Sequence, residues 1–140
     1  NLPASKNPKK YILAGVTEKG SLYSLGGEFK GGELKAKLSA FPYAISLYYD
    51  SLAPKIFYFT IKKSNGNFQF FIKTADDFSG IDEYSILLND EWIPAYYDAK
   101  KDLIYGEIRE NLNTGKHSLS IIVVDKKKNI KKLSKNFIVE

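Results

Sequence analysis

The chain has 140 residues, of which 44% are hydrophobic and 26% are charged; these values are typical of a globular protein and exclude a disordered one. The formal net charge is +5, but Arg109 is the only arginine among 21 cationic residues. Since base readout and phosphate clamping favour arginine, we expect no nucleic-acid binding.

No apolar run approaches the roughly 20 residues of a membrane helix, so we expect no membrane insertion. The chain begins at Asn1 and contains no methionine, so we expect a piece of a longer protein.

The first fifty residues are rich in glycine and predict only three strands, at 10–16, 33–38 and 43–49. Three strands bury too little apolar surface to stand alone. We therefore predict that residues 1–51 are the C-terminal part of a preceding β-rich domain. The segment "DSLAPK" (50–55) follows as a hinge, with Pro54 opening the next strand.

From residue 55 onward, apolar and polar residues alternate with a period of two, as in "NFQFFIKT" (67–74), and ten Tyr and nine Phe also favour strands. Turn signals separate seven predicted strands, at 55–63, 67–75, 82–88, 91–97, 103–109, 116–125 and 130–139. Short strands with turns every 8–12 residues are typical of an immunoglobulin-like sandwich. The predicted fold is all-β, with an immunoglobulin-like (fibronectin type III-like) β-sandwich over residues 52–140.

Two stretches, "DDFSGIDEYSILLNDEWIPAYYDAKKDLIYGEI" (76–108) and "LNTGKHSLSIIVVDKKKN" (112–129), carry a family resemblance. They are similar to the C-terminal immunoglobulin-like region of Bacteroides-type envelope zinc metallopeptidases of the lysostaphin-like, peptidoglycan endopeptidase kind. The similarity covers about 100 of the 140 residues. The matching positions are Asp76 or Asp77, Ser79, Gly80, Ile81, Trp92, Tyr97, Asp98, Lys100, Gly115, Lys116, His117, Asp125 and Asn129. Two turn glycines of that family are replaced here, by Asp90 and Lys128; aspartate tolerates a positive φ, and Asn129 is expected to take the left-handed position beside Lys128.

The resemblance implies a non-catalytic accessory or interaction module in the cell envelope, periplasmic or on the cell surface. Its expected partner is a neighbouring domain of the parent protein or an envelope protein, with glycan or peptidoglycan as a further possibility. It implies no catalysis in this chain, because such peptidases bind zinc through two His and an Asp, whereas His117 is the only histidine. We predict no catalytic residue and no cofactor.

An acidic stretch, residues 76–98, holds seven carboxylates and no Lys or Arg. We favour turn capping, in which Asp and Ser side chains bind the backbone, Gly80 relieves the turn and Ile81 enters the core. The alternative is a calcium site built from Asp76, Asp77, Asp82 and Asp125, since calcium prefers oxygen ligands. A glycosidase pair is a weaker alternative, because no two of these acids have a fixed separation in the sequence.

Aromatic side chains around the sole tryptophan form the second candidate site. Packing between sheets is the role we favour for Trp92. The alternative is a carbohydrate-binding platform, because aromatic faces suit apolar sugar patches. Its members would be Trp92, Tyr96, Tyr97 and Tyr105.

Two further features have structural interpretations. His117 precedes a strand where immunoglobulin-like folds often place a hydrogen-bonded corner tyrosine, so we expect a buried corner residue. Six lysines between 126 and 135 surround a predicted hairpin and the last strand. We expect a solvated edge strand protected from aggregation, in preference to a site for an anionic partner.

Overall fold

The computed structural model describes residues 7–109 and 111–140. These residues form thirteen strands and one short 3-10 helix, η1 (Pro8–Lys10), and contain no α-helix. The all-β prediction is therefore confirmed. Within the described ranges, no helix has the length and apolar character needed to cross a membrane.

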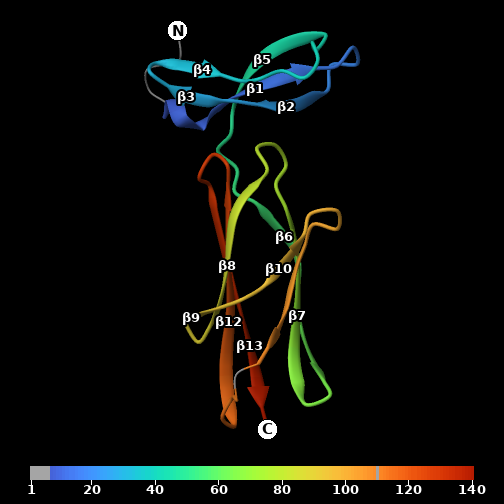
Figure 1. The fold of residues 1–140 in the computed structure, drawn as a ribbon, viewed down its shortest axis with the longest axis vertical. Helices are drawn as coiled ribbons and strands as arrows, with labels where there is room; N and C mark the ends of the chain where they lie inside the picture. Colours follow the sequence, from blue (N-terminus) through green and yellow to red (C-terminus); the bar gives the residue numbers. More distant parts are fainter. Residues whose placement is uncertain (1–6, 110) are drawn as a thin grey trace.

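Strands β6 to β13 form two four-stranded antiparallel sheets, which we call the β6–β13 body (Figure 1). One sheet has the order β10-β11-β7-β6 and the other β13-β12-β8-β9. Their bounds are β6 (Lys55–Ser64), β7 (Asn67–Ala75), β8 (Ile81–Leu88), β9 (Glu91–Ile93), β10 (Tyr96–Asp98), β11 (Leu103–Ile108), β12 (Gly115–Asp125) and β13 (Ile130–Val139).

Both sheets contribute alternate side chains to one shared core, as the period of two predicts. The fully buried members are Phe70, Ile72, Ile104, Ile86, Leu119, Ile121 and Val123. Gly106 makes room for the largest of these, because a Cβ there would lie 2.5 Å from the Phe70 ring. The core is thus closely fitted between the sheets.

The single strand predicted at 91–97 is wrong: β9 pairs with β8 in one sheet, and β10 pairs with β11 in the other. Pro94 lies between β9 and β10. Proline has no N–H to donate to a ladder, so the chain leaves the first sheet there and joins the second.

The N-terminal residues form a three-stranded sheet of order β2-β1-β5 and a β3-β4 hairpin, which cap one end of the β6–β13 body (Figure 1). We call the three strands the N-terminal sheet. Their bounds are β1 (Tyr11–Val16), β2 (Leu22–Gly26), β3 (Glu28–Lys30), β4 (Glu33–Lys35) and β5 (Ala44–Tyr49). The sequence predicted β1, β4 and β5 but missed β2 and β3, because Gly26 and Gly27 between them, both at positive φ, interrupt the alternation.

Four turns of the described chain carry non-glycine residues at positive φ, and two of them bear on the sequence predictions. Asn89 and Asp90 both adopt it at the β8–β9 turn, as expected for Asn and Asp. In the β12–β13 turn, Lys128 itself has φ 61°, so the expectation that Asn129 would take this position is wrong. Asn129 instead directs its side chain into a buried hydrogen-bond network.

Candidate functional site

Three chain segments meet where the N-terminal sheet joins the β6–β13 body. They are the end of β5, the β7–β8 loop and the β12–β13 turn, and each supplies one aspartate. Carboxylate oxygens of Asp50, Asp76 and Asp125 all lie within 4.8 Å of one another. Asp50 and Asp125 are buried and Asp76 is half-buried. We call these three residues the aspartate cluster.

Asp76 holds the β7–β8 loop in shape. Its Oδ2 accepts hydrogen bonds from the backbone N–H groups of Phe78 (3.1 Å) and Gly80 (2.7 Å) and from the Ser79 hydroxyl (3.2 Å). Gly80 has φ 88° and Ile81 packs against the core. The predicted capping is thus found in the β7–β8 turn, at residues 76–81.

Asp125 organises the β12–β13 turn. Its Oδ1 accepts hydrogen bonds from the backbone N–H groups of Lys127 and Asn129, each at 2.8 Å. Its Oδ2 accepts the side-chain amide of Asn129 at 2.7 Å. The same amide donates to the Asp50 carbonyl at 3.2 Å, so Asn129 connects the turn to the end of β5.

Asp50 is only 2% exposed, and its Oδ1 accepts a 3.3 Å hydrogen bond from the Leu52 N–H. Its Oδ2 is buried and has no hydrogen-bond partner among the described residues. Burial raises the pKa of Asp50 above its ordinary value of 3.8, and the charges of Asp125 and Asp76 raise it further, while the Ser79 hydroxyl acts in the opposite direction. Asp50 was expected to be a linker residue; here it is anchored, because its N–H also donates to the Lys10 carbonyl.

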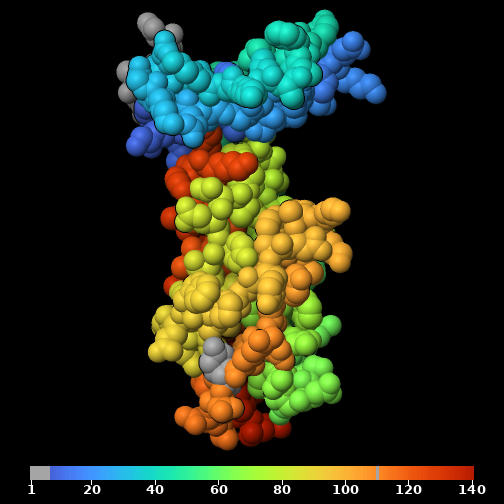
Figure 2. All heavy atoms as spheres, viewed as in Figure 1, coloured from blue at the N-terminus to red at the C-terminus, as the bar shows by residue number. Residues whose placement is uncertain are grey.

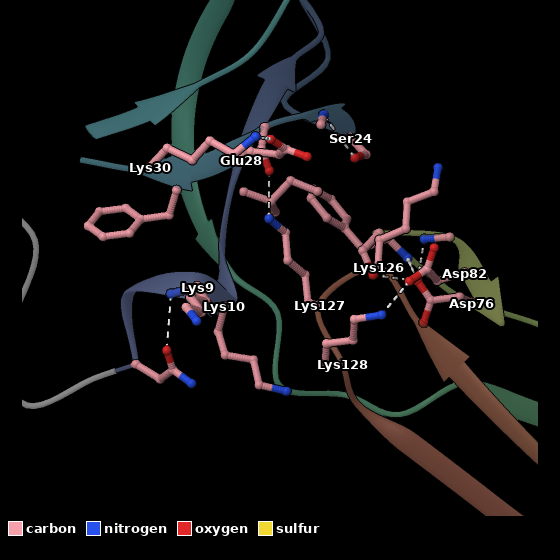
Figure 3. A pocket seen from close by; sticks show the side chains of 18 residues that line it. Lys9, Lys10, Ser24, Glu28, Lys30, Asp76, Asp82, Lys126, Lys127 and Lys128 are labelled. Carbon is pink, nitrogen blue, oxygen red and sulfur yellow. Dashed lines mark hydrogen bonds and ion pairs between the residues drawn. The ribbon is translucent and has the colours of Figure 1, made fainter. Parts of the chain in front are cut away.

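Two lysines tie the junction together. The Lys127 ammonium donates a 2.7 Å hydrogen bond to the Gly27 carbonyl, and that of Lys10 donates to the Asn129 side chain. Burial lowers the pKa of Lys127, while Asp50 and Asp125 oppose that effect. Figure 3 shows Lys127 reaching from its turn towards the N-terminal strands, across an open cavity of about 1020 Å³.

The four calcium candidates therefore separate. Asp76 and Asp125 come together, whereas Asp77 forms an exposed ion pair with Lys55 (2.6 Å) and Asp82 pairs with Lys128 (2.6 Å). Sequence reasoning missed Asp50, the third member of the cluster. Its available signal was the position directly after a strand and shortly before Pro54, at the predicted boundary between two β-rich regions.

The aromatic candidates also separate. Trp92 is 66% exposed on β9, so the expectation that it packs between the sheets is wrong. Tyr96 and Tyr105 form an outward pair with ring centroids 5.7 Å apart. Tyr97 instead packs against the core and lies 5.9 Å from the Tyr84 ring. Within the described ranges no ring contact joins Trp92 to these tyrosines.

A surface that the sequence did not reveal lies on the N-terminal sheet. Tyr23 and Ile45 both pair with Gly15, so they share one face of the sheet. The Tyr23 ring lies across Gly15, where a Cβ would be 2.3 Å away. Leu47 lies two residues along β5 on the same face, and exposed Tyr43 precedes that strand. We call Tyr23, Ile45 and Leu47, together with the adjoining Tyr43, the apolar face.

His117 has the expected hydrogen bonds but is half-buried, not buried. Its Nε2 lies 2.8 Å from the Asn113 carbonyl and its Nδ1 lies 2.9 Å from the Asn89 amide, so it fastens the corner that leads into β12.

The lysine-rich β13 is an edge strand, as predicted, and Lys135 reaches the Phe59 carbonyl of β6 (3.0 Å). The expectation that the six lysines are solvated is wrong for Lys127. Its side chain is buried because its ammonium binds the Gly27 carbonyl at the junction with the N-terminal strands.

No protein-family model matches the chain, and a search of curated proteins finds no significant relative. The resemblance to an envelope metallopeptidase region therefore stays a prediction that rests on the residues quoted for it.

Proposed function

We propose that the chain is a non-catalytic accessory module whose β6–β13 body is an immunoglobulin-like sandwich. The strand order supports this proposal. Taking β6 to β13 as A, B, C, C′, D, E, F and G, the sheets read ABED and GFCC′, the arrangement of this fold class. The hydrogen bond from His117 back to residue 113, at the start of strand F, resembles the corner contact of such domains.

The proposed activity is protein interaction through the apolar face. One observation carries it: Ile45, 53% exposed, shares one side of the N-terminal sheet with Tyr23 and Leu47, and Tyr43, 76% exposed, lies just before the same strand. Adjacent exposed apolar side chains commonly mark interaction sites. The partner that fits is an apolar surface of a neighbouring domain in the parent protein or of an envelope protein. Placement in the periplasm or on the cell surface rests on the family resemblance.

A photo-crosslinking amino acid at position 45, introduced into the protein in its native host, tests this proposal. We expect a discrete covalent adduct with one partner in the envelope fraction. Position 46 is the matched control, because Ser46 is exposed on the same strand and points to the opposite face. Equal adducts at both positions, or none at position 45, would contradict the proposal.

Carbohydrate binding is the second candidate, and the exposure of Trp92 favours it. Tyr96, 64% exposed, and its neighbour Tyr105 offer a separate pair of solvent-facing rings. Stacking on a sugar would change the fluorescence of Trp92, the only tryptophan. A saturable change with one saccharide would establish this second function, and no change with any saccharide of a panel would contradict it.

A further inference from the structure

We propose that the aspartate cluster binds a calcium-type divalent cation at the junction of the N-terminal sheet and the β6–β13 body. Three carboxylates with oxygens within 4.8 Å of one another repel each other strongly when two of them are buried. Such a group needs a compensating positive charge or a bound proton. The proposal is independent of the apolar face and of what that face binds.

The spacing of the oxygens fits the coordination shell of one ion. Calcium–oxygen distances are about 2.3–2.6 Å, so two ligands on opposite sides of the ion lie roughly 4.6–5.2 Å apart. Every pair in the cluster is within that span. The donors are all oxygens, which select a hard cation over zinc or copper. Magnesium is less suitable, because it retains several waters and two of the three carboxylates are buried.

Asp50 supplies a second observation that points to a ligand. Its side chain is 2% exposed, yet Oδ2 has no hydrogen-bond partner among the described residues. Buried polar atoms in native proteins are almost always partnered, so an unpartnered carboxylate oxygen in a group of three carboxylates is suited to bind a cation. Asp76 receives its three hydrogen bonds on Oδ2, so Oδ1 faces no competing donor from these groups.

The nearby lysines do not replace that cation. Lys127 is a buried amine that interacts electrostatically with Asp50 and Asp125, but its hydrogen bond goes to the Gly27 carbonyl. The Lys10 amine donates to the Asn129 side chain. Neither of these two hydrogen bonds ends on the aspartate cluster. A bound cation would join three segments far apart in the sequence and so fix the N-terminal sheet on the body.

The test is calcium titration of the full chain after removal of metal with EDTA and of the EDTA by exchange. Calorimetry and thermal unfolding would follow CaCl₂ from about 0.01 to about 10 mM at pH 7, a range that covers the usual affinities of extracellular calcium modules. MgCl₂ serves as the comparison. The variant is Asp50→Asn, and the matched control is Asp77→Asn, whose carboxylate pairs with Lys55 outside the cluster.

We expect saturable binding and a melting temperature that rises with calcium in the wild type and in Asp77→Asn. Asp50→Asn should lose at least tenfold in affinity; if it does not fold, Asp76→Asn carries the same comparison. Absence of calcium binding by the folded wild type would overturn the proposal. Unchanged affinity in Asp50→Asn, or in Asp76→Asn, would overturn it as well.

Discussion

The ammonium of Lys127 donates a 2.7 Å hydrogen bond to the carbonyl of Gly27, which lies 100 residues away in the sequence. This contact joins the β12–β13 turn to the N-terminal strands and takes Lys127 out of solvent, to 7% exposure. The two regions are therefore held by specific buried polar contacts, in addition to the stacking of Tyr48 on Phe78 at 4.1 Å between ring centroids.

Replacing this amine should destabilise the protein. Lys127→Met keeps the apolar stem but leaves the Gly27 carbonyl without its donor and removes a positive charge near Asp50 and Asp125. We expect a loss of about 1–3 kcal/mol in the free energy of unfolding, measured with urea. Lys126→Met, at the exposed neighbouring position, should change it by less than about 0.5 kcal/mol. Equal effects of the two substitutions would show that the junction contact is unimportant.

The sandwich core should not tolerate a methyl group at position 106. Gly106→Ala places a Cβ 2.5 Å from the Phe70 ring, and overpacking of this kind costs about 1–3 kcal/mol. Phe70→Leu in the same chain should recover part of that loss, which a double-mutant cycle by chemical denaturation would detect. Strictly additive effects would mean that the two residues do not meet in the folded protein.

Trp92 should contribute little to folding. Because its ring is 66% exposed, Trp92→Ala should lower the free energy of unfolding by less than about 1 kcal/mol, well below the 3–5 kcal/mol of a core aromatic. The folded protein should also emit at the long wavelengths of a solvated indole. A blue-shifted emission together with a large loss of stability would place the ring in the core.

The stability of the metal-free protein should depend on Asp50 between neutral pH and pH 4. Its pKa is raised by burial and by Asp125 and Asp76, with Lys127 facing the same group. As pH falls, Asp50 is protonated at a higher pH in the folded state than in the unfolded state. The free energy of unfolding therefore increases as pH falls through the raised pKa towards 3.8. Urea denaturation in EDTA should show this gain in the wild type relative to Asp50→Asn. Parallel pH profiles of the two proteins would contradict it.

Local pattern explains why the strands of the β6–β13 body were predictable. Alternation along β7 and β12 specifies which side chains enter the core, and Asn89–Asp90 marks a tight turn directly. The switch of sheet after β9 was not predictable from alternation, because it depends on Pro94 interrupting a ladder whose partner strand lies elsewhere.

The candidate sites depend on contacts between distant segments, and this limited their prediction. Asp76 and Asp125 were identified from their turns, but Asp50 joins them only because β5 ends beside the β12–β13 turn. The apolar face was missed for a similar reason. Ile45 and Leu47 alternate as core residues do, and nothing local indicates that their side of the sheet is bare.

Cysteine footprinting tests the central claim, that the apolar face is an interface, most directly. The chain has no cysteine, so Ile45→Cys carries a unique thiol. We predict that a maleimide labels it rapidly in the purified protein and slowly in the native assembly, while Ser46→Cys on the opposite face labels equally in both. Equal labelling of Ile45→Cys in the two settings would contradict the claim.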